Sequence, residues 1–184
     1  MRPLTVMLTA ISAALAPQVP AQDLSPAAPI REAVSRIRAD MRAMATAIES
    51  YYVDCNAYPA WVSADSSESI VQGNSVLAAM PTFRRGILPP GGRCVIPLTL
   101  TTPIAYITSL VPDPFNPDVP STFAYYTDGP GWILLSPGPD GDFDVNPRTV
   151  YKSELAQPSA ELLVLSYDPT NGTISDGDLW RVRQ

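Results

Sequence analysis

Two acidic, glycine-containing segments contain the residue types from which cation sites are built. In the first, residues 136–146 (SPGPDGDFDVN), oxygen-bearing side chains recur at every second position: Asp140, Asp142, Asp144 and Asn146. Hard cations such as calcium take six to eight oxygen ligands, and alternating Asp and Asn side chains around a glycine bend direct several oxygens at one centre. The second, residues 168–178 (DPTNGTISDGD), adds Asp176 and Asp178. These six residues are the candidate calcium ligands.

The spacing of these residues leaves a second interpretation open, because Asp-Gly pairs also make ordinary turns. The first segment is not an EF-hand loop, since it lacks the glycine at the sixth position and the glutamate at the twelfth. An extracellular module of this kind is expected to bind calcium weakly, with a Kd of about 10⁻⁴ to 10⁻³ M. The role of the ion would be to order the loops.

Other chemistries have little support in the sequence. The chain contains no histidine, which excludes Ser-His and Cys-His catalysis and histidine-ligated zinc, and it has neither a phosphate-binding glycine loop nor a Gly-x-Ser-x-Gly elbow. Paired carboxylates also serve as acid and base in glycosidases, but in glycine-rich turns they more often bind calcium or face solvent. We therefore expect a protein that is not an enzyme.

The net charge argues against a nucleic-acid partner. The 184 residues carry a formal charge of -6, whereas phosphate contacts need clustered Lys and Arg. The densest basic run lies within residues 31–42, where acidic neighbours dilute it, and it is interpreted as a solvated helix face.

The N-terminus has the layout of a secretory signal peptide. Arg2 precedes an apolar run from Leu4 to Ala16, and the small residues of Val19-Pro20-Ala21 form a cleavage site. The apolar run is shorter than the ~20 residues that span a bilayer. Cleavage after Ala21 is expected. Cleavage after Ala16 and retention as an uncleaved anchor are the alternatives.

This interpretation divides the chain into a signal peptide (1–21), a linker (22–29) and one globular domain (30–184). The domain is expected in the periplasm or outside the cell, with envelope association open and no stable membrane span once the signal is removed. In such an oxidising compartment, Cys55 and Cys94 are expected to form a disulfide. Closing this loop of about 40 residues would stabilise the fold by roughly 3 to 4 kcal/mol.

A long amphipathic helix is predicted over residues 30–52. Its apolar residues follow a spacing of four and three, which places them on one stripe: Ile30, Val34, Ile37, Met41, Met44, Ile48 and Tyr51. Pro29 suits the first turn, and good helix formers fill the segment.

The remaining elements are shorter. A hairpin is predicted from residues 122–127 and 131–136 around Asp128-Gly129-Pro130, and residues 161–167 (ELLVLSY) are either a third strand or a buried apolar segment. Short helices are expected over 75–80 and over 98–110, the latter from a Thr cap, an early proline and apolar residues at 104, 107 and 110. The fold class is α+β, with the long helix packed on a small antiparallel sheet and long Pro/Gly-rich loops.

In order and spacing, several short motifs resemble the major pseudopilin of type II secretion and its type IV pilin-like relatives. The motifs are Tyr51-Tyr52-Val53-Asp54 with Tyr58-Pro59, Leu100-Thr101-Thr102-Pro103, Pro112-Asp113-Pro114-Phe115, Ser136-Pro137-Gly138-Pro139-Asp140-Gly141 and the tail Gly177-Asp178-Leu179-Trp180-Arg181. The resemblance implies a helical spine with a small sheet on its C-terminal half, a structural role without a catalytic site, and partners among pilin-like or secretion-system proteins. It also implies that Asp140, Asp142 and Asp144 bind calcium.

The first 29 residues depart from that family. They contain no Gly-Phe-Thr-Leu-x-Glu type processing site, and Pro17, Pro20, Pro26 and Pro29 interrupt the continuous apolar helix that anchors pseudopilins. The resulting hypothesis is an exported pilin-like domain without the membrane half of its helix, acting as a structural or accessory component. A soluble exported calcium-binding or ligand-binding module with the same fold is the alternative.

Overall fold

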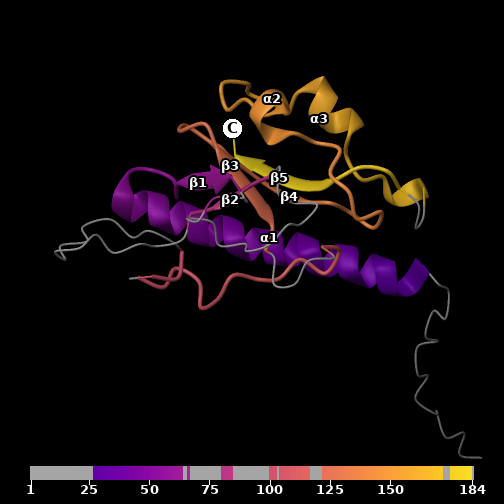
Figure 1. The fold of residues 1–184 in the computed structure, drawn as a ribbon, viewed down its shortest axis with the longest axis horizontal. Coiled ribbons are helices and arrows are strands. Elements are labelled where there is room, and N and C mark those ends of the chain that lie inside the picture. The colour runs from indigo at the N-terminus through magenta and orange to yellow at the C-terminus, as the bar shows by residue number, and fades with distance from the viewer. Residues whose placement is uncertain are drawn as a thin grey trace, which may run out of the picture.

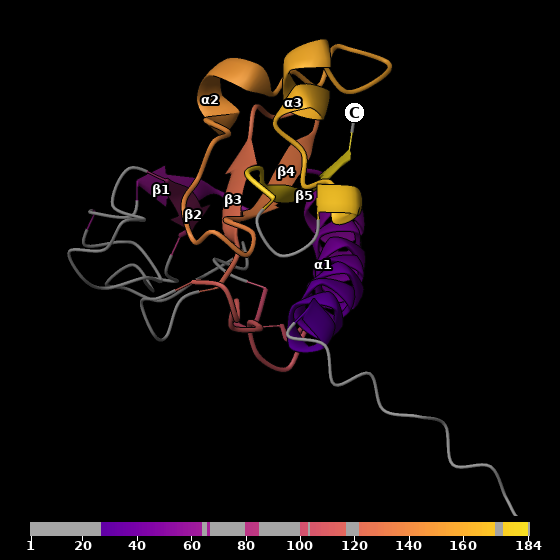
Figure 2. The same cartoon turned by 90° about the vertical axis from the view of Figure 1, so that its right-hand side faces the viewer.

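The computed structural model describes residues 27–63, 66, 80–84, 100–102, 104–116, 122–171 and 175–183. They form an α+β fold in which one long N-terminal helix, α1 (Ala27–Cys55), lies along one face of an antiparallel sheet (Figure 1). Two short helices, α2 (Pro147–Val150) and α3 (Ala160–Val164), lie on the opposite side of the sheet (Figure 2). The predicted signal peptide, and the linker as far as residue 26, lie outside the described residues.

Helix α1 confirms the helix predicted from the apolar stripe and extends it at both ends, so that residues 27–29 are helical. Six of the seven predicted stripe residues are buried, and Ile30 is half-buried at the start of the stripe. Small residues at Ala45 and Ala47 are buried as well. No helix in the described ranges combines the length and apolar character needed to cross a membrane.

The main sheet contains β3 (Ala124–Thr127), β4 (Trp132–Ser136) and β5 (Leu179–Arg183), in that order. The predicted hairpin is confirmed, with Ala124 opposite Leu135 and Thr127 opposite Trp132. Asp128 closes its turn by accepting a hydrogen bond from the N–H of Gly131, and Gly129 has a φ of 108°, which glycine adopts without strain. Strand β5 pairs antiparallel with β4 and forms one edge of the sheet.

Side chains of the sheet alternate between two apolar layers. Tyr125, Trp132 and Leu134 pack with the stripe of α1, whereas Ala124, Ile133 and Leu135 pack with Val145, Val150 and Leu162 on the opposite side. This follows from the two-residue period of a strand, which sends successive side chains to opposite faces. Because both faces are covered, β4 is buried along its whole length.

The structure corrects the third strand. Residues 161–167 do not form one: α3 occupies most of this segment, and Ser159 caps the helix by accepting a hydrogen bond from the N–H of Leu162 at 3.2 Å. Leu162 and Tyr167 are buried and Leu165 packs against the core, but Leu163 and Val164 are 56% and 81% exposed, so this apolar run is only partly core. The third strand is β5, nearer the C-terminus.

The helix predicted over 98–110 is also wrong for the described part of this segment, residues 100–102 and 104–110, which consists of bends. The carbonyl of Leu100 accepts hydrogen bonds from the N–H groups of Tyr106 and Ile107, which closes a loop wider than a helical turn. Ile107 and Leu110 pack on the α1 core as expected, but Ile104 is 51% exposed.

The sequence did not reveal a second, two-stranded sheet made of β1 (Trp61–Ser63) and β2 (Pro81–Phe83). Phe83 stacks on Tyr125 with ring centroids 4.1 Å apart, which joins this small sheet to β3. Of the helix predicted over 75–80, residues 75–79 lie outside the described ranges, and Met80 lies directly before β2.

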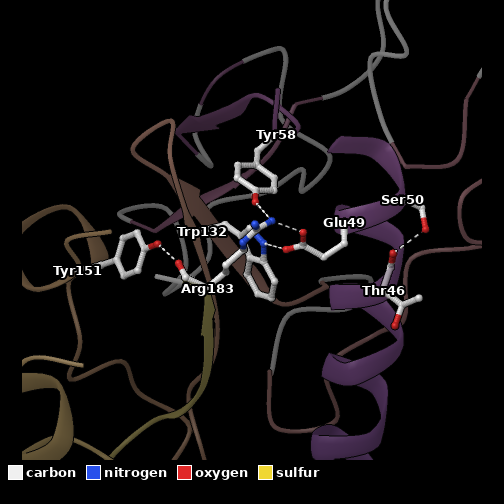
Figure 3. Close-up of polar contacts among 7 residues, drawn as sticks. All are labelled: Thr46, Glu49, Ser50, Tyr58, Trp132, Tyr151 and Arg183. Carbon is white, nitrogen blue, oxygen red and sulfur yellow. Dashed lines mark hydrogen bonds and ion pairs between the residues drawn. The ribbon is translucent and has the colours of Figure 1, made fainter. Parts of the chain in front are cut away.

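A polar cluster joins the C-terminal strand to α1 (Figure 3). Glu49 accepts hydrogen bonds from the indole N–H of Trp132, at 2.8 Å, and from the guanidinium of Arg183, which also donates to the hydroxyl of Tyr58. Tyr151 donates to the carbonyl oxygen of Arg183 from the other side. Glu49 therefore connects the middle of the sheet and the end of the chain to one turn of the helix.

Replacing Glu49 by Ala is expected to lower the free energy of unfolding by about 1 to 3 kcal/mol, because the buried indole N–H of Trp132 would lose its acceptor. Glu49→Gln keeps an acceptor for Trp132 and removes only the half-exposed ion pair with Arg183, so its cost should be below about 1 kcal/mol. Urea unfolding followed by tryptophan fluorescence measures both. Equal losses for the two variants would contradict the role given to the indole bond.

Candidate metal centre

The acidic turn that follows β4 is shaped by glycines. Gly138 and Gly141 have φ angles of 75° and 81°, and the N–H of Gly141 donates to the carbonyl of Gly138 at 3.3 Å. A Cβ atom on Gly138 would lie 2.8 Å from the carbonyl oxygen of Gly177, which itself has a φ of 121°. The missing side chains therefore allow the two predicted acidic segments to touch.

Asp178 lies at the centre of this contact and is fully buried. Its Oδ2 atom accepts a hydrogen bond from the N–H of Val145 at 2.8 Å, and its backbone is held by the N–H and carbonyl groups of residues 165 and 167. Its Oδ1 atom is buried without a hydrogen-bond partner. Burial raises the pKa of Asp178 to about 7, which the backbone N–H groups of Val145 and Asp144 oppose and which repulsion from the carboxylates of Asp144 and Asp140 reinforces.

The other predicted carboxylates surround Asp178 at the surface. Asp140, Asp142, Asp144 and Asp176 are all exposed. The pKa of Asp140 is raised by desolvation and by its neighbours Asp142 and Asp144, and the pKa of Asp144 is raised by desolvation and by Asp142 and Asp176. This mutual repulsion indicates that the fold brings the carboxylates of both acidic segments close together. A bound cation would neutralise their negative charge.

Asn146 has a different local role from the one predicted. Its side-chain oxygen accepts a hydrogen bond from the N–H of Arg148 at 3.1 Å and caps the N-terminus of α2. This is the usual function of Asn before a helix, and Pro147 in the first turn fits it. The oxygen of Asn146 therefore stabilises the first turn of α2, and its predicted role as a calcium ligand stays a prediction.

Asp113, in the proline-rich corner before β3, was not among the predicted site residues. Its side chain is buried, accepts a hydrogen bond from the N–H of Phe115 at 3.0 Å and has a pKa raised to about 6 by desolvation, which Ser136 and Phe115 only partly oppose. The carbonyl oxygen of Phe115 lies 3.9 Å from the Cβ position of Gly141. The corner therefore packs beside the acidic turn. An Asp between two prolines in an apolar stretch was the available signal.

These residues fit a hard cation in charge and ligand type. Asp140 and Asp144 from the first segment lie near enough to Asp178 to raise its pKa, and the unpartnered Oδ1 atom of Asp178 is a buried acceptor that a cation would satisfy. In their present arrangement, no three acidic or cysteine side chains within the described ranges are grouped closely enough to hold a metal ion. Binding would therefore require the exposed carboxylates of the turn to move toward Asp178.

Only one of the two cysteines of the predicted disulfide belongs to the described residues. Cys55, at the end of α1, is a half-buried free thiol, and Cys94 lies outside the described residues. The pairing of these two cysteines stays a prediction.

Comparison with known proteins found no match to a protein-family model, a curated protein or a solved structure. The function must therefore be argued from the fold and from the residues around Asp178.

Proposed function

We propose that this chain is an exported, non-enzymatic domain of the pilin-like kind, acting as a structural or accessory component of a type II secretion or pilus-like system and stabilised by calcium. The observation that carries this proposal is the buried, unpartnered carboxylate oxygen of Asp178 beneath an acidic turn, on a fold with one long N-terminal helix against a small sheet. The sequence motifs that resemble pseudopilins include this turn and the tail that supplies Asp178.

A structural role agrees with the chemistry of the residues. Because the pKa of Asp178 is raised to about 7, its carboxyl group is partly protonated near neutral pH when no cation is bound. A divalent ion that displaced this proton would draw the turn after β4 onto the start of β5. This would order a loop at the surface of the domain rather than activate a substrate. Its partners would be other pilin-like or secretion-system proteins.

Calcium is expected to raise the melting temperature of the purified chain, because an ion bound by the folded state alone stabilises it by RT ln(1 + [L]/Kd). With a Kd of about 10⁻⁴ M, 10 mM calcium corresponds to about 2.7 kcal/mol. Thermal unfolding in EDTA and in 10 mM CaCl2 measures this, with 10 mM MgCl2 as the control for ionic strength. A melting temperature that calcium does not change would overturn the calcium site.

The secretion-system role needs a separate experiment. Mass spectrometry of the native protein identifies its N-terminal residue. Cleavage near Ala21, with recovery in the soluble fraction, supports the exported module. A retained apolar segment, with recovery in the membrane fraction, supports an anchored component. Co-purification with pilin-like proteins from the source cells is the expected result for a secretion component. A cleaved protein that recovers no such partner would favour the soluble calcium-binding or ligand-binding module.

A further inference from the structure

The seam between α1 and β5 is a groove beside an open strand edge. Strand β5 is the outermost strand in the order β3-β4-β5, and within the described part of the chain no strand pairs with its outer edge. Two hollows of about 500 Å³ and 210 Å³ lie along this seam, and Arg181 lines both of them. They are separate from the acidic turn and from Asp178.

The smaller hollow has a concentration of positive charge. Arg38 and Arg42 line it from α1, one helical turn apart on the same face, and Arg181 lines it from β5. All three side chains are exposed, and none is hydrogen-bonded or ion-paired to another side chain in the described ranges. By contrast, Arg36 on the same helix pairs with Asp40 at 3.6 Å.

The larger hollow does not offset this charge. Glu49 is the carboxylate among its described lining residues, and the polar cluster of Figure 3 already engages both of its oxygens, through Trp132 and Arg183. The seam therefore presents three unpaired guanidiniums on a chain whose net charge is -6. Exposed guanidinium groups that have no ion-pair partner can bind carboxylates through charge-assisted hydrogen bonds.

We propose that this seam binds an extended, acidic peptide segment of a partner protein, which adds as a strand to the outer edge of β5 and places its carboxylates on Arg38, Arg42 and Arg181. Side chains on one face of a strand recur every ~6.6 Å, which is close to the 5–6 Å between residues one helical turn apart. The open edge of β5 favours a peptide over a sulfated glycan or a lipid headgroup. The N–H and C=O groups along this edge can form a ladder of hydrogen bonds only with another polypeptide backbone.

The test uses a fluorescein-labelled peptide of eight residues in which Glu and Val alternate, with binding to the full chain measured by fluorescence anisotropy in EDTA. The triple variant Arg38→Gln, Arg42→Gln, Arg181→Gln is expected to weaken binding at least tenfold and to reduce the dependence of binding on salt. Single substitutions Arg38→Gln and Arg36→Gln remove the same charge from the same helix. The first should weaken binding and the second should leave it within about twofold. Melting temperatures confirm that each variant is folded.

Backbone pairing is tested with two further peptides, N-methylated on alternate residues in one register or in the other. In an added strand the backbone N–H groups of alternate residues point toward β5. The peptide methylated on those residues should therefore lose binding, and the peptide methylated on the other residues should keep it. Equal binding of both, or equal effects of Arg36→Gln and Arg38→Gln, would overturn the proposal. So would binding of heparin without binding of the peptide, which would assign the seam to polyanionic glycans. Because these measurements are made in EDTA, they are independent of the calcium site.

Discussion

Replacing Ile48 by Ala is expected to lower the free energy of unfolding by about 2 to 5 kcal/mol, enough to unfold much of a marginally stable domain. Ile48 is fully buried in the cluster that joins α1 to the sheet, where it packs with residues such as Tyr125 and Leu134. The substitution removes three carbon atoms and leaves a cavity between elements that are far apart in the sequence. Urea unfolding followed by circular dichroism measures the loss.

Val53→Ala is the matched control for this substitution. Val53 belongs to the same helix but is 80% exposed, so its truncation should change the free energy of unfolding by less than about 0.5 kcal/mol. If the two variants unfolded at the same urea concentration, the face of α1 that packs on the sheet would be wrongly assigned, and with it the arrangement of the fold.

The contrast between these residues also shows what the sequence could predict. The apolar stripe of α1 repeats with the helical period from Ile30 to Tyr51, so several turns all indicate the same buried face and the prediction is robust. The hairpin was predictable for a similar reason, since Asp128-Gly129 fixes the turn and therefore the register. Residues 161–167 failed because a short apolar run has no period of its own, and the cap at Ser159 selected a helix.

The candidate site was likewise predictable from the sequence only in part. The alternation of Asp140, Asp142 and Asp144 was visible in the sequence, and so was the second acidic segment. What could not be predicted is which carboxylate is buried: Asp178 is buried because it lies where β5 begins against β4 and the segment after α3, a long-range arrangement. Asp113 was missed for the same reason, since its burial depends on packing beside the acidic turn rather than on its neighbours in the chain.

In the absence of calcium, the folded protein is expected to lose stability as the pH rises from about 4 to about 7. A carboxyl group whose pKa is higher in the folded than in the unfolded state stabilises the fold fully below its unfolded pKa, and this contribution disappears as the pH passes its folded pKa. Asp178 loses this contribution up to a pH of about 7 and Asp113 up to about 6, because the ordinary pKa of an aspartate, 3.8, is raised to these values in the folded state. Urea unfolding in EDTA across this pH range measures the slope.

Asp178→Asn separates the two roles of this carboxylate. The amide oxygen can still accept the hydrogen bond from Val145 and the side chain has no charge to desolvate, but its NH2 group takes the place of the unpartnered Oδ1 atom and costs part of this gain. In EDTA at pH 8 the variant should therefore be more stable than the unsubstituted chain by about 1 to 3 kcal/mol. The same variant should lose most of the calcium-induced rise in melting temperature, because it lacks the buried charge that the ion would neutralise. Opposite effects of one substitution are hard to obtain from general destabilisation.

Asp113→Asn is the control, since it also removes a buried carboxylate with a raised pKa but lies in the corner beside the turn. It should flatten the pH slope up to about 6 and leave the calcium effect in place. If Asp178→Asn kept the full calcium effect, the ion would bind elsewhere, and if both variants lost it, Asp113 would belong to the site. A calcium effect lost with Asp178→Asn alone makes the buried carboxylate the ligand on which the surface carboxylates close.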